Sequence, residues 1–120
     1  MSFFVWDIET YCNCFLFSGK FEDTSESQTF EISSRKNERD KLLQWLSYLQ
    51  NTKCAMVGYN SLSFDYPILH ELLTAPYTFD AAKAHLMANT IIGSQSYGIN
   101  PNAIRLQDRI IPQIDLVKIN

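Results

Sequence analysis

Three acidic residues stand directly after two apolar stretches of the chain: Asp7, Glu9 and Asp65. Residues i and i+2 of a β-strand project from the same face with Cα atoms roughly 7 Å apart, so Asp7 and Glu9 can share a metal ion. Asp65 is the natural third ligand. Hard divalent cations such as Mg²⁺ and Mn²⁺ prefer carboxylate oxygens. The residue types and their spacing therefore predict a carboxylate-bound metal site.

Such a site suits phosphodiester hydrolysis. Two divalent ions about 3.5 to 4 Å apart can activate a water molecule and stabilise the leaving oxygen. In this arrangement Asp7 bridges both ions, Glu9 holds one of them and Asp65 completes the second. Each motif is weak alone, because Asp7 and Glu9 also suit a solvated strand end and Asp65 could cap the helix that follows it. The two motifs together, each after an apolar stretch, favour the metal site.

Hydrophobic periodicity predicts the elements that position these motifs. The continuous apolarity of segment 2–8 is typical of a central strand covered on both faces. Alternating apolar and polar residues over 13–21 and 28–33 predict two further, antiparallel strands. Apolar residues at helical spacing predict an amphipathic helix over 37–50, and a short apolar strand follows at 54–59.

The order strand, helix, strand implies a right-handed crossover, so segment 54–59 should run parallel to the first strand. That pairing brings Asp65 towards Asp7 and Glu9. The pattern as a whole predicts an α/β domain with a mixed sheet of about five strands flanked by helices.

The later part of the chain predicts two helices, a loop and a final strand, at 68–73, 80–91, 93–102 and 113–117. Pro67 suits the opening of the first helix, because proline is tolerated in a first helical turn. Thr78 or Asp80 is expected to cap the second helix.

Composition predicts a single folded domain over residues 1–120. Hydrophobic residues make up 46% of the 120 residues, and a chain of this size buries about two-thirds of the surface of its unfolded state. The formal charge of −3 gives no field that would attract a polyanion. A dense basic cluster, formed by Arg35, Lys36, Arg39 and Lys41, is interleaved with acidic residues, so we interpret it as a solvated helix face.

Cysteine usage and targeting signals predict a cytoplasmic protein. The three cysteines form no Cys-x-x-Cys motif, and we interpret them as buried free thiols in a reducing compartment. No segment has the features of a signal peptide, and no apolar run approaches the roughly 18 residues of a membrane span. We therefore expect no membrane partner.

Segments 3–10 and 57–69, with the sequences FFVWDIET and VGYNSLSFDYPIL, resemble the first two motifs of DnaQ-like, or DEDD-type, 3′-to-5′ exonucleases. They look most like the N-terminal proofreading domains of bacteriophage DNA polymerases. The resemblance covers essentially the whole chain, although the stretch between the motifs matches only in pattern. It implies a ribonuclease H-like fold and hydrolysis of the 3′-terminal phosphodiester, in the cytoplasm of a bacterial host if the protein is viral.

The resemblance also implies roles for individual residues. Asp7, Glu9 and Asp65 correspond to catalytic carboxylates that bind two Mg²⁺ or Mn²⁺ ions. The residues expected near the 3′-terminal nucleotide of single-stranded DNA are Thr10, Asn60 and Phe64. Asp115 looks like an aspartate that ends a strand in this family, and we leave open whether it supports the site or has a structural, buried or capping role.

One departure from the family pattern stands out. The third motif of the family is a Tyr or His followed at short spacing by a fourth aspartate, on a helix beyond the last strand. The sequence reaches Asn120 before such a helix, so we expect a domain that lacks its C-terminal helix. His70 and His85 are the internal candidates for a replacement, although both positions also suit ordinary helix residues.

Two other functions stay open at this point. A truncated nuclease fold could act as an interaction module for a polymerase domain, a second protomer or another protein, with apolar surface left uncovered where the last helix would pack. A small metal-dependent endonuclease or ribonuclease would use the same carboxylates. The sequence does not distinguish DNA from RNA, because that choice depends on contacts to the 2′ position.

Overall fold

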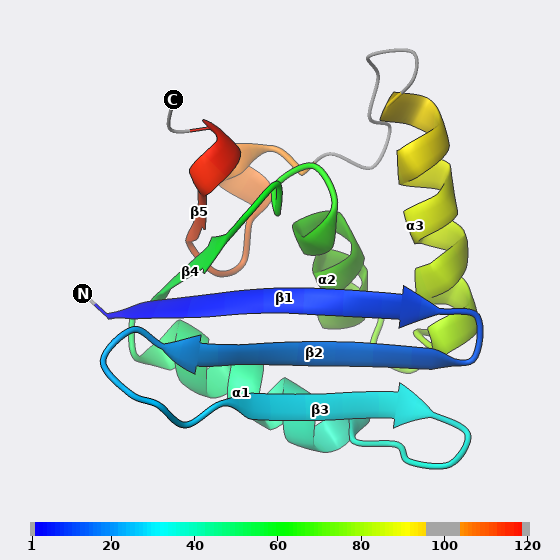
Figure 1. Cartoon of the computed structure of the whole chain (residues 1–120), viewed down its shortest axis with the longest axis horizontal. Helices are drawn as coiled ribbons and strands as arrows, with labels where there is room; N and C mark the ends of the chain where they lie inside the picture. The colour runs from blue at the N-terminus through cyan, green and yellow to red at the C-terminus, as the bar shows by residue number, and fades with distance from the viewer. Residues whose placement is uncertain (1, 96–103, 119–120) are drawn as a thin grey trace.

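A five-stranded mixed sheet with the order β3-β2-β1-β4-β5 forms the centre of the protein (Figure 1). The computed structural model describes residues 2–95 and 104–118. The elements in chain order are β1 (Phe3–Tyr11), β2 (Cys14–Phe21), β3 (Gln28–Ser33), α1 (Arg39–Asn51), β4 (Ala55–Gly58), α2 (Asp65–Thr74), α3 (Ala81–Gln95), a 3₁₀ turn (Leu106–Asp108), β5 (Gln113–Asp115) and a second 3₁₀ turn (Leu116–Lys118).

The strand pairing confirms the α/β class and the order of elements expected from the sequence. β1 lies in the middle of the sheet, β2 and β3 are antiparallel neighbours, and β4 runs parallel to β1. β5 adds a second parallel pair beside β4. The crossover through α1 therefore places the end of β4 next to β1, as the strand, helix, strand order predicts.

The prediction that β1 is covered on both faces is wrong. Phe4, Trp6 and Ile8 are buried, whereas Val5 is 44% exposed and the acidic residues between them face solvent. In Figure 1, α1 lies behind β2 and β3, and α2 lies behind β1. Because the helices pack on one face of the sheet, the alternate side chains of β1 are left on an open face.

The hydrophobic core lies between that one face and the helices. Aromatic residues dominate the strand side: Phe4 stacks on Phe17, and Trp45 of α1 meets Phe4 edge to face, with ring centroids 5.6 Å apart. α3 contributes its small side chains Ala84 and Ala88 to the same cluster. Small residues allow this helix to approach the end of the sheet closely.

Several element boundaries differ from those expected. α2 begins at Asp65 rather than at 68, because the tyrosine and proline that follow Asp65 fit into its first turn. Asp80 rather than Thr78 caps α3, since its Oδ1 accepts the Lys83 N–H at 2.8 Å. The helix continues to Gln95, so the loop expected at 93–102 is wrong for 93–95, and 96–102 lie outside the described residues. β5 ends at Asp115 instead of 117.

All three cysteines are free thiols, but they are not all buried. Cys54 is buried and Cys14 is partly buried, whereas Cys12 is exposed in the two-residue turn between β1 and β2. The prediction of buried thiols is therefore wrong for Cys12. None of the helices in the described part of the chain combines the length and apolarity needed to span a bilayer.

Candidate carboxylate site

The site forms where β4 stops and β1 continues. β4 pairs with β1 only along Phe3 to Val5, so the second half of β1 has no strand beside it on that side. Asp65, the first residue of α2, takes the place of the strand: its Oδ2 accepts the Ile8 N–H at 3.2 Å. The N-cap position of α2 is occupied by Phe64 without a side-chain hydrogen bond, so helix capping does not explain Asp65.

The loop from Tyr59 to Phe64 reaches this position because it folds directly onto the end of β4. A Cβ atom on Gly58 would lie 2.6 Å from Ser61 Cβ and Oγ, which only glycine avoids. The Tyr66 N–H then donates to the Ser61 carbonyl at 2.7 Å and starts the helix. Gly58 therefore sets the path that leads to Asp65.

Asp115 anchors the same loop from the neighbouring strand. Its Oδ1 accepts the Asn60 N–H at 2.8 Å, and its Oδ2 accepts the Leu62 N–H at 3.0 Å. Asn60 has a φ of 58°, a left-handed conformation that asparagine adopts more readily than most residues. The Val117 N–H also donates to Oδ1, at 3.0 Å. Of the two alternatives for Asp115, these contacts support the structural one.

Asp7 and Asp65 meet in this gap. Asp65 is only 7% exposed. Burial, followed by the hydrogen bond and the negative charge of Asp7, raises the pKa of its carboxyl from 3.8 to about 7, and the Ile8 N–H opposes this shift. Without a cation, Asp65 therefore keeps its proton to a higher pH than an ordinary aspartate. A divalent cation can take the place of that proton, so these oxygen donors fit a hard metal ion.

Glu9 lies on the same face of β1 as Asp7, but its carboxylate is turned away from the pair. The Tyr11 hydroxyl donates to Glu9 Oε2 at 3.2 Å. Among residues 2–95 and 104–118, no three His, Cys, Asp or Glu side chains are grouped closely enough to hold a metal ion. The structure thus brings together two of the three expected ligands.

The structure separates the three residues that the sequence places near a nucleotide. Strand alternation places Thr10 on the helix-covered face with Ile8, opposite Asp7. Asn60 is partly buried, and its backbone N–H is the group bound by Asp115. Phe64 is also partly buried and packs against the core.

Neither histidine joins the aspartate pair. His70 Nδ1 is hydrogen-bonded to the Tyr66 hydroxyl at 3.1 Å, and the same hydroxyl accepts the Ile110 N–H at 2.8 Å. The tautomer of His70 decides which of the two groups donates, because the hydroxyl oxygen can accept a second hydrogen bond. His85 Nδ1 is buried without a hydrogen-bond partner in the described part of the chain. Both are helix residues outside the carboxylate site.

Sequence reasoning missed Tyr11. Tyr11 follows Glu9 at the same i, i+2 spacing by which Glu9 follows Asp7. The spacing therefore predicts that all three side chains lie on one face of the strand. The tyrosine ends β1, opposite Cys14.

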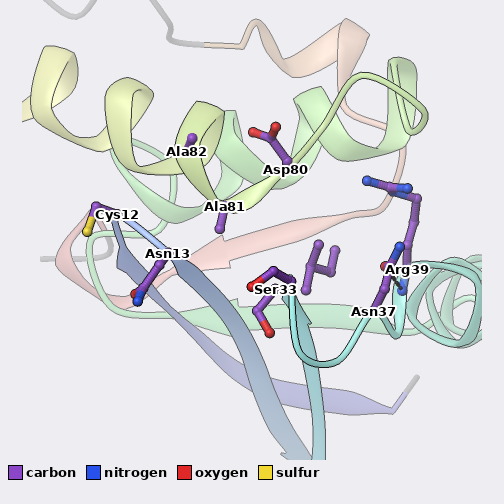
Figure 2. Close-up of a pocket in the computed structure, with 10 residues that line it drawn as sticks. Cys12, Asn13, Ser33, Asn37, Arg39, Asp80, Ala81 and Ala82 are labelled. Carbon is purple, nitrogen blue, oxygen red and sulfur yellow. Dashed lines mark hydrogen bonds between the residues drawn. The ribbon is translucent and has the colours of Figure 1, made fainter.

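A separate hollow of about 370 Å³ lies at the far end of the hairpin, between the β1–β2 turn and the start of α3 (Figure 2). Its lining includes Asn13, Asn37, Arg39 and Asp80, and none of the three expected metal ligands. Arg39 donates to the Phe79 carbonyl, and Asp80 caps α3. With one cationic and one anionic side chain, the lining has no net charge that would select a ligand.

No protein-family model matches this sequence, and no curated protein or solved structure shows significant similarity to it. Fold and site geometry therefore have to support any functional conclusion together with the two sequence motifs.

Proposed function

We propose that the protein is a 3′-to-5′ exonuclease of the DnaQ-like, ribonuclease H-like class, a proofreading-type domain related to those of bacteriophage DNA polymerases. The contact between Asp7 and Asp65 carries this proposal. Two acidic residues from distant parts of the chain meet beside the middle of the central strand β1, where the burial of Asp65 makes a pair of negative charges unfavourable. The mixed sheet is compatible with the fold that the motifs suggest.

The two aspartates would hold Mg²⁺ or Mn²⁺, with Glu9 added once its carboxylate turns from Tyr11. Such ions would activate a water molecule and stabilise the leaving oxygen of a phosphodiester. Asp65 is fixed by the Ile8 N–H and by the start of α2, whereas Asp7 is exposed and faces the solvent from which a substrate would arrive. Asn60 and Phe64, on the loop that leads to Asp65, are proposed to contact the 3′-terminal nucleotide of single-stranded DNA, whereas Thr10 faces the helix-covered side of the sheet and is left out of this proposal.

Degradation of an end-labelled single-stranded oligonucleotide tests this function. We expect Mg²⁺- or Mn²⁺-dependent shortening from the 3′ end by the unmodified protein, and a loss of at least about 100-fold in Asp7→Ala. Asp40→Ala is the matched control, because Asp40 is an exposed aspartate in the first turn of α1. Equal rates for the unmodified protein and Asp7→Ala would refute the site, and cleavage within an RNA oligonucleotide would favour the endonuclease or ribonuclease.

The open face of the sheet favours a second function, that of a protein-interaction module. Val5, Val57 and Ile114 stand side by side in register across β1, β4 and β5, and Val5 is 44% exposed. Exposed apolar rows of this kind often mark an interface. Sedimentation velocity would support this function if the protein self-associates and Val5→Lys makes it monomeric, with no nuclease activity in either form.

A further inference from the structure

The open face of β1 carries a row of three polar side chains, Asp7, Glu9 and Tyr11, at successive i, i+2 positions. Asp7 meets Asp65 at one end of the row, and Tyr11 stands at the other end. Glu9 lies between them and can lean either way. Its Oε2 accepts the Tyr11 hydroxyl at 3.2 Å, so it leans towards Tyr11 and away from the aspartates.

We propose that Tyr11 is a positioning residue that holds Glu9 away from the aspartate pair until a divalent cation binds. This inference rests on the proposed function, because it assigns a role to Tyr11 only if Glu9 is a metal ligand. Metal binding then requires the Glu9 carboxylate to leave the Tyr11 hydroxyl. The cation competes with this hydrogen bond, and its apparent affinity is lowered accordingly.

The hairpin holds the backbone of Tyr11 in place, whereas the Glu9 side chain is free to move. Tyr11 is the last residue of β1, and the two-residue turn to Cys14 holds its backbone in the hairpin. Glu9 keeps its rotamer freedom because both side chains are exposed, with Tyr11 at 50%. The negative charge of Glu9 and then its hydrogen bond raise the pKa of Tyr11.

Mn²⁺ titration by calorimetry, without nucleic acid, measures the effect. Tyr11→Phe keeps the ring and removes only the hydroxyl, so Glu9 is free to turn. We expect Mn²⁺ to bind about two- to tenfold more tightly, which is the net contribution of an ordinary intramolecular hydrogen bond. Tyr48→Phe is the matched control, because Tyr48 is equally exposed at 50% and stacks on Trp45 of α1. Its affinity should not change.

A double-mutant cycle separates this role from general effects on the strand. In Glu9→Gln the ligand itself is removed, so adding Tyr11→Phe should leave the Mn²⁺ affinity unchanged. Thermal unfolding of each variant shows whether stability has moved as well, since a merely structural tyrosine would shift the unfolding midpoint and not the Glu9-dependent affinity.

The outcomes distinguish this inference from the proposed function. If the unmodified protein binds Mn²⁺ and Asp65→Asn does not, the carboxylate site stands. Unchanged or weaker binding by Tyr11→Phe in that situation overturns the role of Tyr11 alone, and so does an equal effect of Tyr11→Phe with and without Glu9. Absence of Mn²⁺ binding by the unmodified protein overturns both.

Discussion

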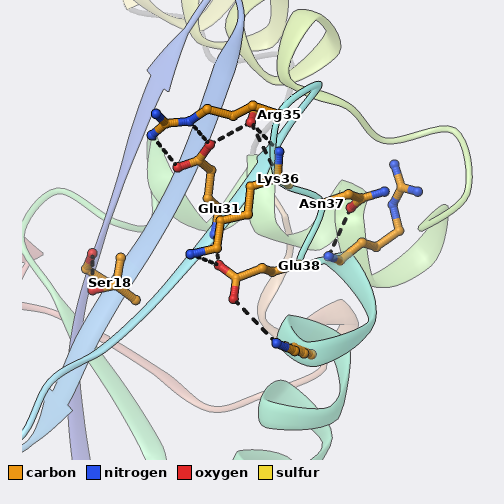
Figure 3. Close-up of polar contacts among 10 residues, drawn as sticks. Ser18, Glu31, Arg35, Lys36, Asn37 and Glu38 are labelled. Atoms are coloured by element: carbon orange, nitrogen blue, oxygen red, sulfur yellow. Dashed lines mark hydrogen bonds and ion pairs between the residues drawn. The ribbon is translucent and has the colours of Figure 1, made fainter.

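Glu31 and Asp65 are buried to the same extent, with 7% of each residue exposed, but their carboxylates have opposite partners. Figure 3 shows Arg35 reaching Glu31 in a two-pronged contact. Arg35 donates to the two carboxylate oxygens at 2.8 and 3.0 Å, and the Ser33 hydroxyl donates to Glu31 Oε2 at 2.6 Å. Arg35 and then Ser33 lower the pKa of Glu31 from 4.5 to about 2. Asp65 instead faces Asp7, and its pKa is raised to about 7.

The difference shows that Glu31 has a cationic partner and that Asp65 has none within the described residues. Glu31 already has its cation, and its neighbourhood joins β3 to α1: the Glu31 N–H donates to Glu38 Oε1 at 3.0 Å, and the Glu38 N–H donates to the Glu31 carbonyl at 2.8 Å. These bonds also protect part of the β3 edge. Asp65 has one backbone donor and a second carboxyl beside it. A cation is therefore the group that its environment lacks.

Metal affinity should separate the two residues most strongly. Asp65→Asn removes a ligand charge at the site, so we expect Mn²⁺ to bind at least about 100-fold more weakly. Glu31→Gln, at a carboxylate of equal burial, should leave the affinity within about twofold of the unmodified protein. Calorimetric titration of both variants makes the comparison, and equal losses would mean that Mn²⁺ binds to general negative charge rather than to this pair.

A third buried carboxylate gives a way to displace Asp65 without touching it. Asp115→Ala leaves the N–H groups of Asn60, Leu62 and Val117 without their acceptor. Because unpaired buried donors are costly, we expect the free energy of unfolding to fall by about 3 kcal/mol, with weaker Mn²⁺ binding as well.

Urea unfolding measures that change. Asp108→Ala is its control, since Asp108 forms an exposed ion pair with Arg105 and such pairs contribute at most about 1 kcal/mol. A stable Asp115→Ala variant with full metal affinity would show that the loop from Tyr59 to Phe64 does not need this anchor.

Much of the fold could be predicted from the sequence because strands and helices differ in hydrophobic period. The alternation over 13–21 and the leucines of 37–50 correspond to β2 and α1 within a few residues. The parallel pairing of β4 with β1 followed from the crossover rule alone. The open face of β1 could not be read in this way, because an apolar run at the start of the strand hides which face the helices cover.

The candidate site likewise has contacts that the sequence predicts and contacts that it does not. The order of elements predicts the topology, and the topology brings Asp65 towards Asp7. Side-chain rotamers decide that Glu9 turns to Tyr11, and the path of one loop decides that the Asn60 N–H donates to Asp115. Periodicity contains no information on either, so these contacts had to come from the structure.

Stability in the absence of metal should depend on pH through Asp65. Its folded pKa of about 7 lies above the ordinary 3.8, so the folded state retains a proton that the unfolded chain releases. Its contribution to stability is therefore complete below about pH 4 and is lost as the pH rises towards about pH 7. Asp65→Asn should remove this slope, because an amide does not titrate and its oxygen can still accept the Ile8 N–H.

Urea unfolding in a chelating buffer at several pH values tests the slope, with Glu31→Gln as a variant that should keep it. Adding Mn²⁺ at neutral pH should restore stability to the unmodified protein and not to Asp65→Asn. A flat profile for the unmodified protein would mean that the folded state does not retain a proton on Asp65.

Glu31 should give the smallest effect, with the opposite sign. Its folded pKa of about 2 lies below the ordinary 4.5, so its contribution to stability is present above about pH 4.5 and is lost as the pH falls towards about pH 2. Glu31→Gln should therefore melt a few degrees below the unmodified protein at neutral pH, and the gap should close in acid. Thermal melts at neutral and acidic pH measure the gap. A gap that stays constant would assign the loss to packing around Ser33 rather than to the charge that Arg35 balances.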